Sequence, residues 1–372
     1  MSDNKLGGGV YTVVGTRPEI IKVAPVVRAC VDKRVANQIV HTGQHYSYEM
    51  DSLIFEDLSL PIPEYNLKTG SGSHAEETAR ALVGLERFFK QVNPRMVLVQ
   101  GDTNSALAGA LAASKLHIPV GHIEAGLRSF DREMPEEKNR VLIDHISDIL
   151  FAPTTISAEN LAREGIPEAK TLITGNTIVD AVNLGLHLLE ARSKEEMIPA
   201  TADDDRFFLM TLHREENVDS EARLRRILKG VSMVSSKLET SVVFPAHPRT
   251  VKRIKQYAIP VPESVHLTEP NGYLDFLRLE RDADLILTDS GGVQEEACIL
   301  GVPCVTLRRS TERPETVKVG ANYLSGNEPK EIVSAAEAMT NAPRHWMNPF
   351  GDGNAGIRIV DSIVQNGWSN AL

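Results

Sequence analysis

Short apolar runs, rich in β-branched residues, alternate along the chain with longer segments in which apolar residues recur at helical spacing. After the first run, at residues 10–14, Ile20, Val23 and Val27 recur three to four positions apart, as on one face of a helix. Runs of this kind predict strands at residues 10–14, 38–41, 96–100, 118–124, 207–211, 241–245, 285–288 and 303–307. Because the runs are continuously apolar and separated by helical segments, they predict parallel sheets with helices on both faces.

The alternation occurs twice along the 372 residues, which exceed the roughly 100–200 residues of a typical domain. Charged residues gather at 190–196 and 203–205, just before the strand expected at 207–211. We therefore expect two doubly wound α/β domains, with the boundary at about residue 180. Ligands of such sheets bind beyond the carboxyl ends of the strands, so a cleft between the two domains is the expected site.

The charge and cysteine content narrow the class of protein. Fifty acidic against forty basic residues give a net charge of −10, opposite in sign to proteins that bind bulk nucleic acid or anionic membranes. Cys30, Cys298 and Cys304 form no CxxC pair, which favours a reducing compartment over a disulfide framework. The first residues lack a signal-peptide pattern, and the most apolar segment, residues 106–120, is too short and polar to span a bilayer. We expect a cytoplasmic protein.

Several fingerprints of cofactor and metal sites are incomplete. Residues 70–75 match GxGxxA, but they follow no clear strand, and no acidic residue ends a strand about 20 residues later. Ser73 and Glu76 instead form a capping-box pattern, so a loop and a helix start explain this segment better. The chain has neither a P-loop nor a GxSxG motif, and the HxE pattern at residues 122–124 lacks its PCxxC partner.

Two acidic residues stand at the ends of successive expected strands. Asp102 and Glu124 are separated by one helix and one strand, so in neighbouring parallel strands their carboxylates would lie roughly 5–10 Å apart at one edge. Such a pair suits acid/base chemistry. Glu136, in the polar loop at residues 131–139, is a third candidate. From the residues alone, Asp102 is also explained as a helix N-cap and Glu124 as an ion-pair partner of Arg128.

Two glycine-containing turns between a strand and a helix predict anion binding. At residues 15–19 backbone N–H groups meet a helix N-terminus, and Arg17 and Lys22 add positive charge. The segment at 289–296 repeats the plan, and Glu296 lies where a carboxylate could accept hydrogen bonds from a ribose diol. From the residues alone, a plain turn with solvated basic residues also explains the first segment, and an acid favoured by the helix dipole in an N-terminal turn also explains Glu296. His213 and Arg313, which each follow an expected strand, are further candidates, although a lone histidine is more often a structural hydrogen-bonding residue.

Nine motifs occur in an order typical of one enzyme family. They are GTRPE (15–19), QGDT (100–103), GHIEAGLRS (121–129), PEEKNR (135–140), GNTIVDA (175–181), HRE (213–215), LTDSGGVQEEA (287–297), TERPE (311–315) and NPFGDG (348–353). With them the chain resembles the non-hydrolysing UDP-N-acetylglucosamine 2-epimerases, in their archaeal-type branch. The resemblance extends from about residue 11 to residue 361.

The resemblance implies the glycosyltransferase-B architecture, in which two Rossmann-like domains face each other across a cleft. The first domain would comprise residues 1–180 and the second, UDP-binding domain residues 181–355, with a C-terminal helix at 356–372 packing back on the first domain. The implied reaction interconverts UDP-N-acetylglucosamine and UDP-N-acetylmannosamine through elimination of UDP to 2-acetamidoglucal and re-addition. It requires no NAD and no metal, and its enzymes are commonly homodimers.

Carried over by position, the resemblance implies roles for individual residues. Asp102, Glu124 and Glu136 match the catalytic carboxylates, without a division between acid and base. The substrate-binding positions implied are Arg17, Lys22, His213, Phe276, Ser290, Gly291, Gly292, Glu296 and Arg313. Among these, Phe276 would lie beside the uracil and Glu296 would bind the ribose.

One segment departs from the pattern of many bacterial members, which bind a second UDP-N-acetylglucosamine as an activator through a segment beginning QHR. Here the corresponding residues are Gln44, His45, Tyr46 and Ser47, without the arginine. Activation by substrate therefore stays open.

Three alternative functions are compatible with the motifs. They are a hydrolysing epimerase that releases N-acetylmannosamine and UDP, a glycosyltransferase of the same fold, and a nucleotide-sugar-binding regulator without chemistry. The presence of all three candidate carboxylates argues against the last.

Overall fold

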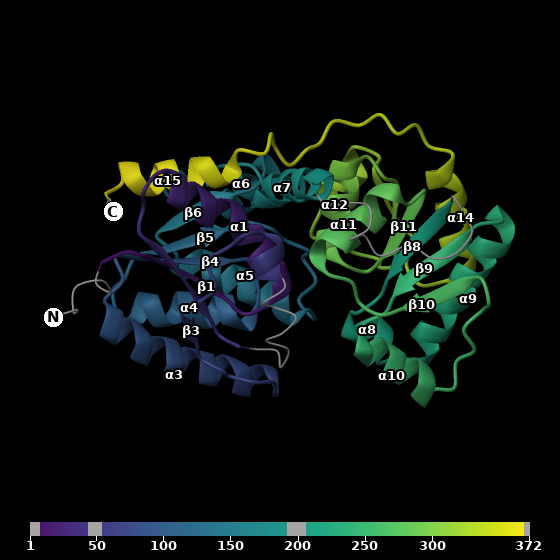
Figure 1. Ribbon diagram of the computed structural model, residues 1–372, viewed down its shortest axis with the longest axis horizontal. Coiled ribbons are helices and arrows are strands. Elements are labelled where there is room, and N and C mark those ends of the chain that lie inside the picture. The colour runs from purple at the N-terminus through teal and green to yellow at the C-terminus, as the bar shows by residue number, and fades with distance from the viewer. Residues whose placement is uncertain (1–7, 44–53, 192–205, 368–372) are drawn as a thin grey trace. The chain divides into compact units, whose positions relative to one another are not determined.

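The computed structural model of the chain describes residues 8–43, 54–191 and 206–367. These residues form two compact units, one within the bounds Met1–Leu184 and Phe350–Leu372 and the other within Gly185–Pro349 (Figure 1). The chain thus passes between the units after residues 184 and 349, where the sequence placed the divisions after residues 180 and 355. Each unit contains one parallel sheet covered by helices, so the prediction of two Rossmann-like α/β domains is confirmed.

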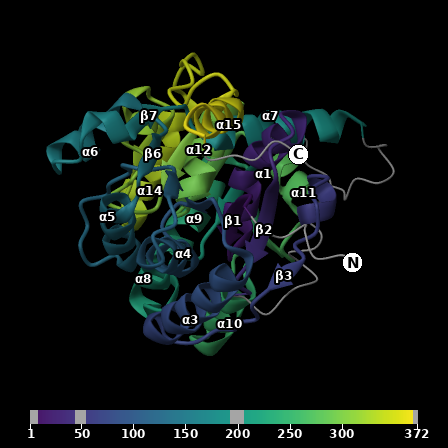
Figure 2. The same ribbon diagram turned by 90° about the vertical axis from the view of Figure 1, so that its left-hand side faces the viewer.

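The first unit is built on a seven-stranded parallel sheet with the order β3-β2-β1-β4-β5-β6-β7. Its strands are β1 (Val10–Val14), β2 (Asn37–His41), β3 (Tyr65–Asn66), β4 (Met96–Gln100), β5 (Val120–Ile123), β6 (Ile149–Ala152) and β7 (Thr171–Ile173). β1 lies beside β2 on one edge (Figure 2) and beside β4 on the other. The strand order reverses between β1 and β4, the point at which doubly wound sheets bind their ligands.

Helices cover both faces of this sheet. They are α1 (Arg17–Asp32), α3 (His74–Val92), α4 (Asn104–Lys115), α5 (Pro135–Ile146), α6 (Thr155–Arg163), α7 (Thr177–Ala191) and the C-terminal α15 (Ala355–Gln365), with a 3₁₀ turn at Glu168–Lys170. α3 and α4 pack on one face, and α1 and α15 on the other (Figure 1). Along β4, Val97 and Val99 enter the first core, and Met96 and Leu98 enter the second, as strand alternation requires.

Local sequence signals set several helix ends in this unit. The predicted capping box is present, because Ser73 accepts a hydrogen bond from the backbone N–H of Glu76 and the Glu76 carboxylate accepts one from that of Ser73. α15 begins where the Asp180 carboxylate accepts from the backbone N–H groups of Ala355 and Gly356. A Cβ at Gly356 would lie 2.8 Å from the backbone of Pro25, so glycine allows α15 to pack closely on α1.

The second unit is built on a six-stranded parallel sheet with the order β10-β9-β8-β11-β12-β13. Its strands are β8 (Phe207–Thr211), β9 (Ser241–Pro245), β10 (Val265–Thr268), β11 (Leu285–Thr288), β12 (Cys304–Thr306) and β13 (Asn322–Leu324). Its helices are α8 (Glu215–Val218), α9 (Glu221–Leu238), α10 (Pro248–Gln256), α11 (Tyr273–Asp282), α12 (Gly291–Leu300), α13 (Pro314–Lys318) and α14 (Pro329–Thr340). α9, α10 and α14 pack on one face, α11 and α12 on the other, and the strand order reverses between β8 and β11.

Within the three described ranges, no helix is both long and apolar enough to cross a membrane.

Candidate active site

The turn from β1 to α1 is held by Glu19, a residue that the sequence motifs contained but did not mark as a candidate. Its carboxyl group accepts hydrogen bonds from Gly15 N (2.9 Å), Thr16 Oγ1 (2.9 Å) and Thr103 Oγ1 (2.6 Å). Thr103 is the N-cap of α4, so Glu19 joins the turns that follow β1 and β4. A Cβ at Gly15 would collide with Ser105, so this turn requires glycine. The two turns at the strand-order reversal are therefore fixed to each other.

Burial raises the pKa of Glu19 to about 7 from an ordinary value of 4.5, although the three donated hydrogen bonds oppose the shift. The folded chain therefore holds this proton more tightly than the unfolded chain does. The free energy of unfolding falls as the pH rises from about 4.5 to about 7, by about 3 kcal/mol in total. We expect Glu19→Gln to remove this part of the pH dependence. Urea unfolding between about pH 5 and pH 7 measures how the free energy of unfolding changes with pH. The same change with pH in Glu19→Gln as in wild type would contradict the assignment to Glu19. Glu86→Gln, at an exposed position, serves as control.

Glu124 follows β5 directly, and its carboxylate is held from two sides. Lys22 Nζ lies 2.5 Å from Oε1, and Gln100 Nε2 donates to Oε2 at 2.5 Å. The side chains of Lys22 and Glu124 are 6% and 4% exposed, so the pair lies largely out of water. Glu124 also adopts φ 71°, a region that non-glycine residues rarely occupy and that recurs at functional sites. The alternative ion pair with Arg128 has no support, because Arg128 contacts Asp144 and Glu164.

Asp102 lies in the turn after β4, the strand that pairs with β5. Its carboxylate is 27% exposed and contacts Arg140 of α5, with Nη2 at 2.6 Å and Nε at 2.8 Å from Oδ2. The Arg140 guanidinium also lies 2.5 Å from Glu137 Oε2, and Asn139 Nδ2 donates to the Asp102 carbonyl. The N-cap of α4 is Thr103, so the explanation of Asp102 as a helix cap is wrong.

Glu136 and Arg17 both lie in the first turn of a helix. The structure places Glu136 in α5, not in a polar loop, because Pro135 begins this helix and acidic residues favour its N-terminal turn. Its neighbour Glu137 is buried and accepts hydrogen bonds from the backbone N–H of Phe130 and from Arg140. Arg17 begins α1, and both candidate side chains are partly buried.

A buried polar chain supports the Asp102 turn. His122 Nε2 lies 2.8 Å from the carbonyl oxygen of Gly101, and Nδ1 lies 2.6 Å from Asp144 Oδ1. Asp144 Oδ2 in turn lies 2.7 Å from Arg128 Nη2. Among the described residues no group of three His, Cys, Asp or Glu side chains is arranged to hold a metal ion.

Burial alone would raise the pKa of Asp144, but His122 and Arg128 hold it below its ordinary value. We expect Asp144→Asn to lower the free energy of unfolding at neutral pH by about 3 kcal/mol, because Arg128 loses one of its two carboxylate partners and His122 loses the carboxylate beside Nδ1. A carboxyl group whose pKa is lower in the folded than in the unfolded chain stabilises the fold at a pH above its unfolded pKa. This stabilisation is lost as the pH falls and the carboxylate becomes protonated. The difference from wild type in urea unfolding should therefore narrow below about pH 4. Asp361→Asn, which removes an exposed pair with Lys33, should change stability by less than about 1 kcal/mol; an equal loss would contradict the account.

In the second unit, Asp289 joins the turns that follow β8 and β11. Its buried carboxylate accepts hydrogen bonds from the backbone N–H groups of His213 (3.1 Å) and Arg214 (3.0 Å) and from Asn217 Nδ2 (3.1 Å). The His213 ring contacts the same carboxylate through Nδ1 at 3.1 Å and remains 48% exposed. Burial opposes ionisation of Asp289, but His213 and the donated hydrogen bonds hold its pKa below the ordinary value. His213 is thus fixed by one nitrogen while much of its ring stays accessible.

α12 begins at the predicted glycine-rich turn. Ser290 is its N-cap, with Oγ accepting from the backbone N–H of Val293. A Cβ at Gly291 would lie 2.6 Å from Glu312 Oε1, whereas one at Gly292 would meet nothing closer than Ser290 Oγ at 3.9 Å. The first backbone N–H groups of this helix are suited to an anion. Glu296 lies farther along the same helix and is 7% exposed.

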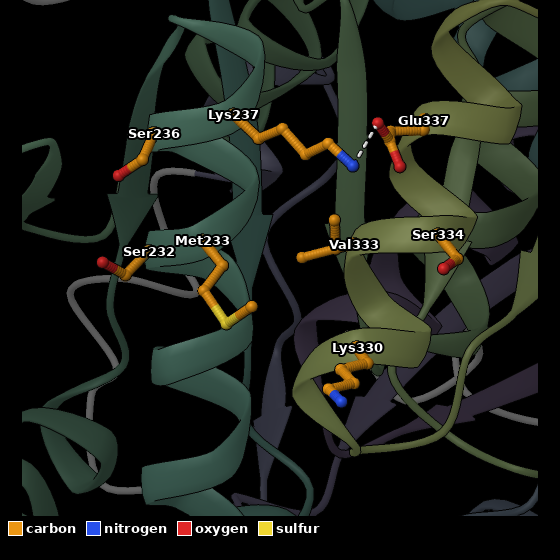
Figure 3. Close-up of a pocket in the computed structure, with 8 residues that line it drawn as sticks. All are labelled: Ser232, Met233, Ser236, Lys237, Lys330, Val333, Ser334 and Glu337. Atoms are coloured by element: carbon orange, nitrogen blue, oxygen red, sulfur yellow. Dashed lines mark ion pairs between the residues drawn. The ribbon is translucent and has the colours of Figure 1, made fainter.

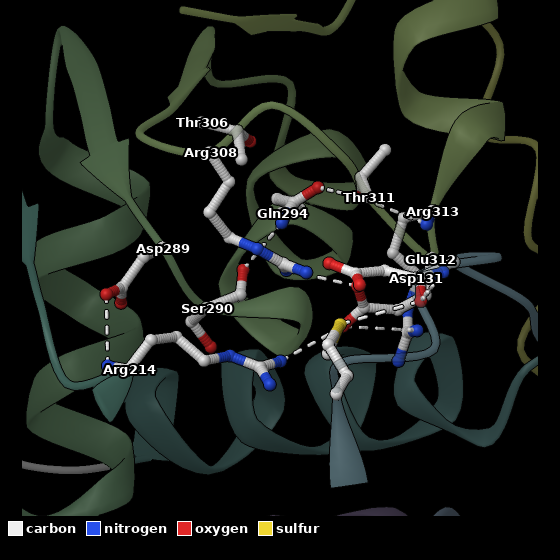
Figure 4. A network of polar contacts seen from close by, with 12 residues as sticks. Asp131, Arg214, Asp289, Ser290, Gln294, Thr306, Arg308, Thr311, Glu312 and Arg313 are labelled. Carbon is white, nitrogen blue, oxygen red and sulfur yellow. Dashed lines mark hydrogen bonds and ion pairs between the residues drawn. The ribbon is translucent and has the colours of Figure 1, made fainter. Parts of the chain in front are cut away.

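Arg313 belongs to a buried network of arginines and glutamates (Figure 4). Its Nε donates to Glu295 Oε1 at 2.5 Å. The carboxylate of Glu312 lies among three arginines, with Arg308 Nη1 at 3.0 Å, Arg214 Nη2 at 3.1 Å and Arg313 Nη1 at 4.0 Å. The sequence motifs did not mark Glu312, Arg308 or Glu295, although Glu312 stands beside Arg313 in TERPE. These contacts fix the guanidinium groups in advance of any ligand.

The remaining candidates lie in less polar surroundings or outside the described residues. Phe276 of α11 packs against the core on the α11–α12 face.

A shallow groove between α9 and α14 contains none of the candidate residues (Figure 3). The ion pair of Lys237 with Glu337, at 2.6 Å, crosses this groove. The segment at residues 44–47, on which activation by substrate depends, lies outside the residues that the structure describes.

Known proteins share both the sequence and the fold. A model of the UDP-N-acetylglucosamine 2-epimerase family matches residues 28–364. The UDP-N-acetylglucosamine 2-epimerase of Methanocaldococcus jannaschii is 52% identical over 353 residues, which are 94% of this chain and 96% of that protein. A crystal structure of the M. jannaschii enzyme in complex with UDP-GlcNAc and UDP has a TM-score of 0.91 at 50% identity, covering 96% of this chain and 99% of that chain. The UDP-2,3-diacetamido-2,3-dideoxy-D-glucuronate 2-epimerase of Pseudomonas aeruginosa is 41% identical over 360 residues, 96% of this chain and 99% of that protein.

The family match covers most of the described residues in both units, and the archaeal relative matches nearly the whole chain. The resemblance that the nine motifs indicated is therefore confirmed, and the protein is an isomerase. The chain belongs to the UDP-N-acetylglucosamine 2-epimerase family, in its archaeal-type branch.

Proposed function

We propose that the chain interconverts UDP-N-acetylglucosamine and UDP-N-acetylmannosamine at C2, through elimination of UDP and its re-addition. The observation that carries the proposal is the pair of carboxylates at the ends of β4 and β5. Glu124 is held by Lys22 and Gln100, and Asp102 is held by Arg140. Two carboxylates with different partners at one sheet edge supply both the base and the acid that the reaction requires.

The C2 proton of the substrate is not adjacent to a carbonyl group, so the reaction needs a leaving group. A carboxylate removes this proton as the C1–O bond breaks, and the electrons of the C2–H bond form the C1=C2 double bond of 2-acetamidoglucal. UDP leaves with the electrons of the C1–O bond. In the return step a UDP oxygen bonds to C1, and C2 takes a proton from the opposite face. Asp102, Glu124 and Glu136 are the proposed acid and base groups, because epimerisation requires a proton donor or acceptor on each face.

The second unit is proposed to bind the UDP portion. The α12 N-terminus at Ser290, Gly291 and Gly292 offers backbone N–H groups, and the fixed guanidinium of Arg313 offers charge to a departing diphosphate. His213 contributes an accessible ring nitrogen beside the same turn. Such preorganised donors are worth roughly 3–4 kcal/mol each at developing charge. Glu296 is proposed to accept from the ribose hydroxyls, Phe276 to contact the uracil, and Arg17 to act with Lys22 at the sugar end.

Product analysis separates this function from its alternatives. We expect the purified chain to convert UDP-N-acetylglucosamine into UDP-N-acetylmannosamine with no acceptor and no added cofactor. Free N-acetylmannosamine with UDP would indicate hydrolysis, a requirement for an acceptor would indicate a glycosyltransferase, and binding without turnover would indicate a regulator. Because a relative named for UDP-2,3-diacetamido-2,3-dideoxy-D-glucuronate is 41% identical, that compound is the competing substrate to test; the higher identity to UDP-N-acetylglucosamine epimerases favours the first substrate.

We further propose that the enzyme assembles as a homodimer, as its relatives commonly do. Sedimentation equilibrium tests this directly, and a monomer at micromolar concentration would exclude it. The cytoplasmic location stays a prediction from the cysteine content and the N-terminal sequence.

A further inference from the structure

Two buried carboxyl groups of the second unit face each other across α11 and α12. Glu280 of α11 is 0% exposed, and neither of its oxygens meets an N–H or O–H donor among the described residues. The carboxyl group of Glu296 lies close enough to Glu280 for the two carboxyl groups to share a hydrogen bond, and its charge acts on Glu280. Two carboxylates cannot hydrogen-bond without a proton between them, so one of the pair is a carboxylic acid.

The surroundings of Glu280 determine which member carries the proton. In the described part of the chain, the titratable groups that interact electrostatically with Glu280 are Glu296 from α12, Tyr273 from its own helix and Cys304 from β12. None of these is a cation, and all are buried. Burial, and then the charge of Glu296, raise the pKa of Glu280 well above its ordinary value. Glu296 is 7% exposed and lies nearer to water, so Glu280 is the acid and Glu296 the carboxylate.

The neighbouring Tyr273 does not supply the hydrogen-bond donor that Glu280 lacks. It lies seven residues before Glu280, on the same face of α11. Its hydroxyl is buried without a hydrogen-bond partner in the described part of the chain, so it does not supply the missing donor. A purely structural position here would favour an apolar side chain, since an unpaired buried carboxyl group is costly.

We propose that Glu280 is a positioning residue for nucleoside recognition: as the protonated acid it donates a hydrogen bond to Glu296 and holds that carboxylate ionised and oriented toward the ribose hydroxyls. This inference rests on the proposed function, in which Glu296 binds the ribose. With one oxygen of Glu296 fixed by Glu280, the other is directed to accept from the 2′- and 3′-hydroxyls. Ionisation of Glu280 would place two negative charges side by side and disturb this arrangement.

Calorimetric titration with UDP and with inorganic pyrophosphate tests the role of the donor. In Glu280→Leu, which removes the donor, we expect UDP affinity to fall about tenfold, with pyrophosphate affinity unchanged. Glu280→Gln keeps an N–H donor and should bind UDP within about twofold of wild type. In turnover, Glu280→Leu should raise KM and leave kcat nearly unchanged. Asp282→Asn, an exposed change on the same helix, is the matched control.

The pH dependence gives a second readout that does not require the leucine variant to fold. UDP affinity of the wild type should fall as alkaline pH ionises Glu280, and that of Glu280→Gln should not. Equal UDP affinity in wild type and Glu280→Leu would overturn the inference, as would an equal loss for pyrophosphate or the same pH profile in Glu280→Gln. Failure of the wild type to bind UDP would overturn the proposed function and this inference with it, whereas the other results would leave the proposed function intact.

Discussion

Replacement of Glu124 by glutamine should lower kcat for the conversion of UDP-N-acetylglucosamine by about 10³-fold. The amide has nearly the same shape and can still accept from Gln100, but it cannot take up or return a proton. Lys22 also loses its anionic partner, which lies 2.5 Å away in a largely buried pair. Initial rates measured by chromatography of the two UDP-sugars give the effect.

UDP affinity provides the control for this variant. The proposed UDP contacts belong to the second unit, so Glu124→Gln should bind UDP as the wild type does. Glu133→Gln, an exposed change in the first unit, should leave both kcat and UDP affinity unchanged. A kcat within about tenfold of wild type would remove Glu124 from the acid/base machinery.

Replacement of Arg313 by lysine should lower kcat/KM by about 10²-fold. Lysine keeps a positive charge beside the buried carboxylate of Glu295, so the fold is retained. It lacks the planar fork that can hold Glu295 through Nε and still present a second nitrogen to a phosphate oxygen. Steady-state kinetics with both substrates measures the loss.

A matched change shows whether the effect belongs to this arginine. Arg281→Lys alters an exposed arginine of the same unit, paired with Asp282, and should leave kcat/KM unchanged. Arg313→Gln should in addition lower the melting temperature, because the buried carboxylate of Glu295 then loses its ion pair with Arg313. Full activity in Arg313→Lys would contradict a role in diphosphate binding.

The sequence predicted the central strands of both sheets because these are continuously apolar. It missed the edge strands β3, β7, β10 and β13, which are short and partly exposed and therefore lack that pattern. It also missed β6, whose four buried apolar residues are too few to distinguish a strand from a helix. The strands that were predicted nevertheless sufficed to predict the fold class, because strands that alternate with helices form regular βαβ units.

The positions of Asp102 and Glu124 followed from the ends of the expected strands, but their partners did not. Lys22 and Glu124 are 102 residues apart, and no local pattern connects them. Glu19 and Glu312 lie within the motifs, but each is held by a residue from another turn, Glu19 by Thr103 and Glu312 by Arg214. Glu280 lies in no motif, and its significance emerges only from burial beside Glu296. Sequence periodicity predicts at which edge of a sheet these side chains gather, whereas the pairing of charges across that edge is a tertiary property.

In the proposed mechanism the C2 proton leaves the substrate and is replaced by a proton from solvent. The most direct measurement is proton NMR of UDP-N-acetylglucosamine incubated with the purified protein in D₂O, without added cofactor. We expect UDP-N-acetylmannosamine with deuterium at C2, and almost no deuterium incorporation with Glu124→Gln. UDP-N-acetylmannosamine that retains hydrogen at C2, or a spectrum that never changes although UDP binds, would rule this mechanism out.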